Sequence, residues 1–254
     1  MTAFEQTLAS GVVIRQDFRK AVRFAMYETG FEGWDYATHG GTLLVVNVQD
    51  RAFGVTCSHI LGDFDWRQLV VTDFKFGRAI AGLKAVYRPA LPVGDAVGSD
   101  VLDLTIIEFA EDVGPGFFGD TAYIFDPGTI TSSHSGDKLL VNGAFKAESK
   151  LVDQTIAPMF GLLEFLDAGP SGSDPVLRKG LAVFREREFE GLTGLSGSPV
   201  FNVTRRRLAG VLARGGIVGP QATMHYIDIA HVDFLLRAIL SGELAANYRI
   251  AVAN

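Results

Sequence analysis

The sequence has few of the features that mark disulfide-rich, membrane-spanning or nucleic-acid-binding proteins. A single cysteine in 254 residues cannot close an intrachain disulfide, which excludes a disulfide-stapled scaffold. No run approaches the 18 apolar residues that a transmembrane helix needs. The 23 basic residues are scattered and outnumbered by 29 acidic ones, so no basic footprint for a nucleic acid backbone exists. We therefore expect neither a nucleic acid nor a membrane among its partners.

The first residues also lack the basic and apolar pattern of an export signal, since the first positive charge is Arg15. Together with the single cysteine, this predicts a cytoplasmic protein. Hydrophobic residues at 48% and charged residues at 20% are typical of a globular chain with a buried core. The 29 glycines predict many tight turns.

Short apolar and β-branched runs separated by turn residues predict an all-β protein. Residues 42–48 and 52–56 are expected to form a hairpin with its turn at Asp50 and Arg51. Residues 21–28 fit either a strand or a helix that continues from Asp17. Further strands are expected at residues 69–72, 83–87, 104–109, 123–125, 138–141, 162–165, 181–185, 200–203, 208–212 and 223–227.

One long helix is expected near the C-terminal end, because apolar residues follow helical spacing between Asp228, a suitable N-cap, and Gly242, a suitable stop. Residues 110–119 contain Gly-Pro-Gly and form the predicted linker between two β-rich halves.

Three segments carry candidate chemistry. Residues 194–201 read Gly-Leu-Ser-Gly-Ser-Pro-Val-Phe, where the two glycines permit a tight turn that would project the Ser196 hydroxyl. Amide N–H groups in such a turn would suit an acyl-transfer nucleophile. The alternative is a plain Gly-Ser turn before a strand. His59 after one strand and Asp103 before another are, taken singly, more often structural.

Together these residues follow the order His59, Asp103, Ser196, with separations of 44 and 93 residues. On that order and spacing the chain resembles the trypsin-like, chymotrypsin-fold serine peptidases over about residues 20–240. Thr-Cys-Ser-His at 56–59 looks like the family's Thr-Ala-Ala-His segment. Asp-Leu-Thr-Ile-Ile at 103–107 and the segment at 194–200 look like the family's aspartate and nucleophile segments.

The resemblance implies an all-β fold of two six-stranded antiparallel β-barrels, with the active site between them and a C-terminal helix. It divides the chain into an N-terminal extension at 1–20, a first barrel at 21–112, a second barrel at 113–227, and a helix with a tail at 228–254. The implied function is a serine endopeptidase that cleaves a polypeptide substrate through an acyl-enzyme and uses no cofactor or metal.

In the roles that the resemblance implies, His59 takes the Ser196 proton and later protonates the leaving amine, while Asp103 orients the imidazole. The N–H groups of Gly194 and Ser196 form the oxyanion hole. Asp100 competes with Asp103 for the acid's role, and we favour Asp103 because the hydrophobic run begins directly after it.

The resemblance also implies substrate-binding positions. Ala213, Arg214 and Gly215 would pair with an extended peptide, and residues 223–226 would lie beside the specificity pocket. Glu190 lies near the expected base of that pocket, where it would favour Lys or Arg substrates; the alternative is an exposed loop glutamate.

Departures from the family shape the prediction. Leu195 stands where activatable members carry the aspartate that pairs with a newly cut N-terminus, so activation by N-terminal cleavage is not expected. Order at the site would then come from packing, oligomerisation or a regulatory protein partner, and residues 1–20 are a candidate regulatory element. Residues 197–202 are closest to bacterial members such as glutamyl endopeptidases, but Leu212 and Ala213 replace the histidine that recognises glutamate there.

Two other functions were weighed. An α/β-hydrolase needs glycine where this chain has Ser198, and it needs its acid and histidine after the nucleophile. A catalytically silent peptidase-fold protein that acts as a binding or scaffolding module remains the alternative, favoured by the unusual Cys57-Ser58 pair and Leu195.

The remaining reactive residues receive structural interpretations. His39, His134 and His231 are not at metal-ligand spacing. Cys57 is expected to be a buried small hydrophobe, and residues 205–207, Arg-Arg-Arg, the tip of a hairpin.

Overall fold

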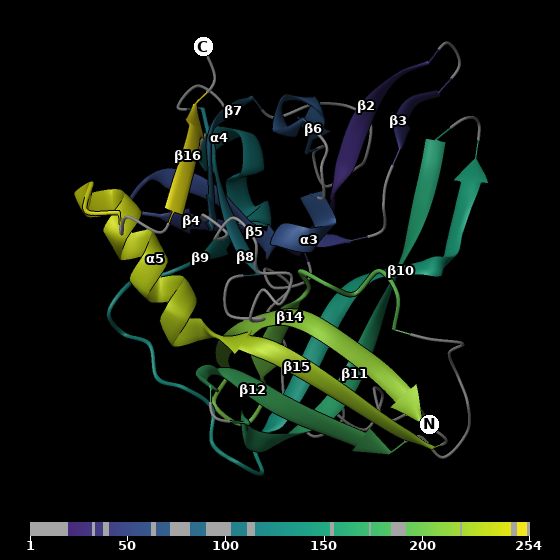
Figure 1. The fold of residues 1–254 in the computed structure, drawn as a ribbon, viewed down its shortest axis with the longest axis vertical. Helices are drawn as coiled ribbons and strands as arrows, with labels where there is room; N and C mark the ends of the chain where they lie inside the picture. Colours follow the sequence, from purple (N-terminus) through teal and green to yellow (C-terminus); the bar gives the residue numbers. More distant parts are fainter. Residues whose placement is uncertain are drawn as a thin grey trace, which may run out of the picture.

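Strands make up most of the regular structure, as predicted (Figure 1). The computed structural model describes residues 20–31, 34–37, 41–61, 65–71, 82–89, 103–110, 115–152, 155–172, 174–183, 192–218, 220–244 and 248–252. No helix in those ranges is both long and apolar enough to cross a bilayer.

The first half of the chain builds a seven-stranded sheet. Its order is β1-β4-β5-β8-β7-β16, with β9 added in parallel beside β4. Three further strands, β2, β3 and β6, form a small separate sheet. The strands of this half are β1 (Val22–Phe24), β2 (Met26–Phe31), β3 (Trp34–Ala37), β4 (Thr42–Val48), β5 (Arg51–Cys57), β6 (Leu69–Val70), β7 (Leu83–Pro89), β8 (Leu104–Phe109), β9 (Tyr123–Ile124) and, from the end of the chain, β16 (Tyr248–Val252).

The second half forms a closed six-stranded barrel in the order β10-β11-β12-β15-β14-β13. These strands are β10 (Lys138–Val152), β11 (Thr155–Ser171), β12 (Asp174–Val183), β13 (Pro199–Asn202), β14 (Arg207–Val218) and β15 (Gln221–Asp228). The helical segments within the described ranges are α3 (Ser58–Leu61), α4 (Pro115–Phe118), α5 (Ile229–Ser241) and two 3-10 turns at Trp66–Gln68 and Gly119–Thr121. A closed barrel, a second sheet and a C-terminal helix confirm the predicted fold class.

The C-terminal helix α5 has the predicted ends. The Asp228 carboxylate accepts a hydrogen bond from the Ala230 N–H at 2.9 Å, and Gly242 ends the helix in the left-handed conformation with φ 74°. Its apolar side packs into the large core cluster that both halves share, and β16 then pairs with β7. The last part of the chain therefore returns from the barrel to the first half.

Some strand predictions were wrong in place or extent. The β4–β5 turn lies at Gln49 and Asp50, one residue before the predicted position, and both residues have the left-handed φ (47° and 62°) of a type I′ loop. Strand β12 begins seven residues before the predicted 181–185, and its charged Arg178 is buried. Strands β10, β11 and β14 are longer than predicted, because stretches such as residues 146–150 are too polar to show strand alternation. Strands β3 and β16 were missed.

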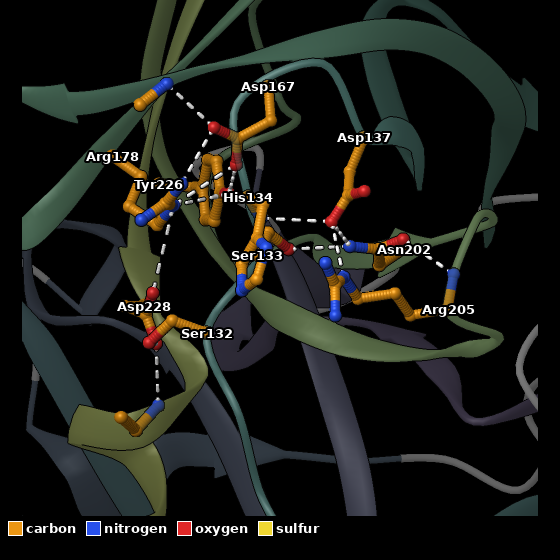
Figure 2. Close-up of polar contacts among 12 residues, drawn as sticks. Ser132, Ser133, His134, Asp137, Asp167, Arg178, Asn202, Arg205, Tyr226 and Asp228 are labelled. Atoms are coloured by element: carbon orange, nitrogen blue, oxygen red, sulfur yellow. Dashed lines mark hydrogen bonds and ion pairs between the residues drawn. The ribbon is translucent and has the colours of Figure 1, made fainter.

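A buried ion pair lies inside the barrel (Figure 2). The guanidinium of Arg178 donates to both carboxylate oxygens of Asp167, at 2.8 and 3.0 Å, and the Tyr226 hydroxyl donates to the same carboxylate. Burial is the main reason that the pKa of Tyr226 lies far above its usual value, and the Asp167 carboxylate adds to it. The charge of Arg178 therefore has the partners that a buried charge requires.

A second polar cluster holds the connection between the two halves against the barrel (Figure 2). The carboxylate of Asp137 accepts hydrogen bonds from Asn202 at 2.8 Å, from Arg205 at 2.6 Å and from the backbone N–H of His134 at 2.9 Å. Burial by itself raises the pKa of Asp137, but these bonds outweigh it and lower the pKa from 3.8 to about 2. The charged form of this carboxylate therefore stabilises the fold.

We predict that Asp137→Asn makes the free energy of unfolding depend less on pH in acid. A carboxylate with a lowered pKa contributes its stability above the unfolded-state value near pH 4, and loses it as the pH falls towards 2. Urea unfolding should show the wild type losing about 1–2 kcal/mol more than the variant between pH 5 and pH 2. If the free energy of unfolding fell equally with pH in the two proteins, Asp137 would not be the carboxylate responsible.

Candidate active site

The ends of two paired strands bring His59 and Asp103 together. In the antiparallel pair β5–β8, Cys57 lies opposite Leu104. Ser58, which follows β5, is therefore a neighbour of Asp103, which precedes β8, and His59 comes next along the chain. The Nδ1 atom of His59 is 2.6 Å from Oδ2 of Asp103, and the backbone N–H of His59 donates to Oδ1 at 2.9 Å. The carboxylate therefore fixes both the ring and the backbone of His59, with Nε2 turned away from Asp103.

Short helix α3, which contains His59, is held against the start of β8. The backbone N–H of Ser58 donates to the carbonyl oxygen of Asp103 at 3.0 Å, and the Ser58 hydroxyl lies 2.8 Å from that of Thr105. About half of the His59 side chain, 52%, is exposed, against 19% for Asp103. The imidazole is thus both oriented and accessible, as proton transfer to a bound substrate requires.

The segment around Ser196 is a tight turn that depends on its glycines, as predicted. Gly194 and Gly197 adopt left-handed backbone conformations, with φ 98° and 81°. A Cβ atom at Gly197 would lie 1.9 Å from the carbonyl oxygen of Thr42, so no side chain fits there. Leu195 between them is 1% exposed and packs in the apolar core of the barrel.

The two amides proposed for the oxyanion hole are available. Within the described residues, neither the Gly194 nor the Ser196 backbone N–H donates to a protein acceptor. The carbonyl groups of the same residues, by contrast, accept hydrogen bonds from Thr42. Two donors in one constrained turn are suited to an oxygen supplied by a ligand.

The Ser196 turn and the His59 segment meet at one carbonyl group. The oxygen of Leu212 accepts from the Cys57 thiol at 3.1 Å and from the Gly197 N–H at 2.8 Å. The hydroxyl of Ser196 donates to the carbonyl oxygen of Ala213 at 3.1 Å, and not to the His59 ring, among the described contacts. In unliganded enzymes the hydrogen bond between nucleophile and base is often long or poorly aligned.

Thr42, expected from the sequence only as the start of a strand, joins the two halves. Its backbone N–H donates to the carbonyl of Ser196 at 2.8 Å, and its hydroxyl donates to the carbonyl of Gly194 at 3.1 Å. The same hydroxyl accepts from the Ala144 N–H of the barrel at 3.0 Å, and the Thr42 carbonyl accepts from Thr56 at 2.7 Å. No motif marks this residue, because its role depends on contacts with positions about 100 and 150 residues away.

The predicted substrate-binding residues lie along β14. Ala213 falls at an irregularity between Leu212 and Arg214 in the pairing with β15, while Arg214 and Gly215 are exposed. The carbonyl of Ala213 also accepts the Ser196 hydroxyl, so this strand passes beside the candidate nucleophile. The predicted Glu190, the competing Asp100 and the N-terminal residues 1–19 lie outside the described residues.

One group of metal-ligand type occurs in the described part of the chain. Ligand atoms of Cys57, His59 and Asp103 lie within 4.8 Å of one another. In this structure His59 bonds Asp103, and the buried free thiol of Cys57 bonds Leu212, as expected for a small core residue. The arrangement is therefore that of an oriented acid–base pair with a thiol packed behind it.

We predict that the Thr42 hydroxyl stabilises the junction between the two halves, which is formed by the bonds of Thr42 to Gly194, Ser196 and Ala144. Thr42→Val keeps the side-chain shape but leaves the Gly194 carbonyl and the Ala144 N–H buried without a partner, and each such loss costs about 1–3 kcal/mol. Urea unfolding should show the valine variant destabilised by about 2–4 kcal/mol. Thr42→Ser retains the hydroxyl and should lose about 1 kcal/mol or less. Equal losses in the two variants would mean that packing, not the hydroxyl, matters.

Comparison with known proteins identifies the fold. No protein-family model and no curated protein matches the chain in sequence. Its structure is similar to that of neuropsin, a serine protease expressed in the limbic system of mouse brain, with a TM-score of 0.59 and 12% identity over 89% of this chain and 96% of that one. It is also similar to human heparin binding protein, with a TM-score of 0.59 and 11% identity over 89% and 94%. At these identities the likeness establishes the fold alone, and that fold is the barrel fold of the trypsin-like serine proteases.

Proposed function

We propose that the protein is a serine endopeptidase that cleaves polypeptides through Ser196, His59 and Asp103. The observation that carries this proposal is the 2.6 Å contact between His59 and Asp103, made where the glycine-bracketed Ser196 turn meets the same strand ends. The trypsin-like fold supports it, because the three residues follow the family's order along the chain.

Catalysis would begin when the Ser196 hydroxyl leaves the Ala213 carbonyl and attacks the scissile carbonyl carbon. His59 Nε2 takes the hydroxyl proton, and Asp103 stabilises the resulting imidazolium. The N–H groups of Gly194 and Ser196 donate to the oxyanion of the tetrahedral intermediate. His59 then protonates the departing amine, which leaves an acyl-enzyme for water to hydrolyse with His59 again acting as base.

In this proposal the enzyme needs no cleavage at its N-terminus to become active. Leu195 has no carboxylate to receive a new N-terminus and is buried in the barrel core. The turn is held instead by Leu195 packing and by Thr42. A relationship to bacterial members such as glutamyl endopeptidases rests on residues 197–202. A cytoplasmic location and control by a protein partner complete the proposal, supported by the free thiol and by Leu195.

The direct test is labelling with a fluorophosphonate, which reacts with activated serine hydroxyls. We predict one adduct, on Ser196 by peptide mass spectrometry, and no labelling of Ser196→Ala. That variant should unfold at nearly the wild-type urea concentration, since it deletes only a partly exposed hydroxyl. A folded wild type that never reacts at Ser196 would overturn the proposal.

A second prediction concerns the acid. Asp103→Asn keeps the side-chain shape but favours the wrong imidazole tautomer, so turnover should fall by about 10⁴. Asp100→Asn is the matched control, because it makes the same change three residues earlier, and it should leave turnover within a few-fold of wild type. If the Asp100 variant were the inactive one, the assignment of the acid would be wrong.

The alternative function is a catalytically silent binding module with the peptidase fold. Two observations favour it: the Ser196 hydroxyl bonds Ala213 rather than His59 among the described contacts, and one of the similar structures is named as a heparin binding protein. Failure of the folded protein to label at Ser196 would support this alternative over the enzyme.

A further inference from the structure

Three side chains at the end of β5 and the start of β8 carry atoms that can bind a transition-metal ion. The Cys57 sulfur, a ring nitrogen of His59 and a carboxylate oxygen of Asp103 all lie within 4.8 Å of one another. Ligand atoms that share a tetrahedral Zn²⁺ lie about 3.3–3.7 Å apart, since bonds to zinc are about 2.0–2.3 Å long. Shifts of about 1 Å therefore bring the three atoms to the distances of a zinc site.

The chemistry of these three groups favours zinc. Thiolate, imidazole and carboxylate are all zinc ligands, and a thiolate beside an imidazole is poorly suited to Mg²⁺ or Ca²⁺, which prefer oxygen ligands. Cys57 as a thiolate and Asp103 as a carboxylate carry two negative charges, which balance the two positive charges of the ion. The set therefore differs from a cluster of acidic residues alone.

Backbone contacts hold the ligand residues close together. Cys57 is the last residue of β5 and lies opposite Leu104, the neighbour of Asp103 in the chain. The backbone N–H of Ser58 donates to the Asp103 carbonyl at 3.0 Å, and the N–H of His59 donates to Asp103 Oδ1 at 2.9 Å. Because paired strand ends position the ligands, little conformational entropy is lost when an ion binds.

The present hydrogen bond of Cys57 can be given up. Its thiol donates to the Leu212 carbonyl at 3.1 Å, and the same oxygen accepts from the Gly197 N–H at 2.8 Å. Loss of the thiol bond therefore leaves that buried carbonyl with a donor. The His59 and Asp103 side chains are 52% and 19% exposed, so an ion from solvent would meet them first and the buried thiol afterwards.

Binding would exchange a proton for the ion. The Cys57 thiol releases its proton to solvent as the Zn–S bond forms, because the thiolate is the ligand. His59 binds through Nδ1, the ring nitrogen that now lies 2.6 Å from Asp103, and its ring carries the proton on Nε2 instead. Asp103 binds the ion through the oxygen that faced Nδ1, and water takes the fourth position.

We propose that Cys57, His59 and Asp103 form a Zn²⁺ site that inhibits the protein. A zinc-bound imidazole with its proton on Nε2 cannot accept the Ser196 proton, and Asp103 no longer stabilises an imidazolium. The inhibitory role rests on the proposed peptidase function. The ligand set rests on the geometry of the three side chains.

Titration of Ser196→Ala with Co²⁺ tests the site without any need for activity. Co²⁺ substitutes for Zn²⁺, and a thiolate bound to it produces a charge-transfer band in the near ultraviolet. Cys57 is the single cysteine, so the band can come from no other residue. We predict a band that saturates at one equivalent of Co²⁺ and disappears when Zn²⁺ is added. Absence of the band in the folded protein would overturn the proposal.

Variants of the ligands test whether the three side chains act together. Cys57→Ser and His59→Ala should each weaken Zn²⁺ binding, measured by competition with a chelating dye, by more than about 100-fold, which exceeds the usual effect of residues that only support a ligand. Cys57→Ala replaces the serine variant if that variant does not fold. His134→Gln is the matched control, because it removes an exposed imidazole elsewhere, and it should keep the wild-type affinity. Wild-type affinity in His59→Ala would reduce the site to a lone thiol and overturn it.

Fluorophosphonate labelling tests whether the ion inhibits. Saturating Zn²⁺ should slow labelling of wild-type Ser196 by about 100-fold or more, the usual contribution of a general base, and EDTA should restore it. Cys57→Ser should label at a rate that the same Zn²⁺ concentration does not change. Equal inhibition of the two proteins would place the inhibiting ion elsewhere and overturn the proposal.

Failure of the peptidase proposal is distinguishable from failure of the zinc site. A folded wild type that never labels, even in EDTA, would contradict the peptidase function, while the Co²⁺ titration would still establish or reject the site. Labelling in EDTA together with no Co²⁺ band would reject the site and leave the peptidase function standing.

Discussion

Thr42 is the residue through which the first sheet holds the Ser196 turn, because its peptide group and its hydroxyl both cross the junction between the two halves. Its N–H and hydroxyl bind the carbonyls of Ser196 and Gly194, on either side of Leu195, and in the described part of the chain the Gly194 and Ser196 amides have no protein acceptor. The Thr42 carbonyl in turn lies where a side chain at position 197 would be, so Gly197 is required by the approach of the opposite half. One buried threonine thus couples the β4–β5 hairpin, which leads to His59, to the turn that carries Ser196.

The residues of the candidate site were predictable where local chemistry marks them. A serine between glycines, a histidine just after a strand and an aspartate just before one are visible in sequence, and the structure places His59 against Asp103. Thr42 and the Leu212 carbonyl were not predictable, because each acts through contacts far away in the chain and the second is a backbone atom. The rotamer of Ser196, turned to Ala213, also has no sequence signal.

Local signals also decided which parts of the fold could be predicted from the sequence. Helix α5 has its cap, apolar stripe and stop within the chain, and its ends were predicted to the residue. Strand β8 was found in full because all of its side chains are buried. Strand β12 was misplaced because buried Arg178 breaks the apolar pattern, and only its partner Asp167, eleven residues earlier, makes that burial tolerable. Strand β16 pairs with β7 across most of the sequence, beyond the range of local patterns.

The central claim is that this junction presents Ser196 as a nucleophile between an oriented imidazole and two amides that have no acceptor among the described residues. A crystal structure of the protein after reaction with diisopropyl fluorophosphate tests it most directly. We predict a phosphoryl group on Ser196 Oγ, with its oxygen within 3.1 Å of the Gly194 and Ser196 amide nitrogens. The His59 ring should face the adduct and still be bonded to Asp103. An unmodified Ser196 that keeps its bond to Ala213, or an adduct whose oxygen meets neither amide, would contradict it.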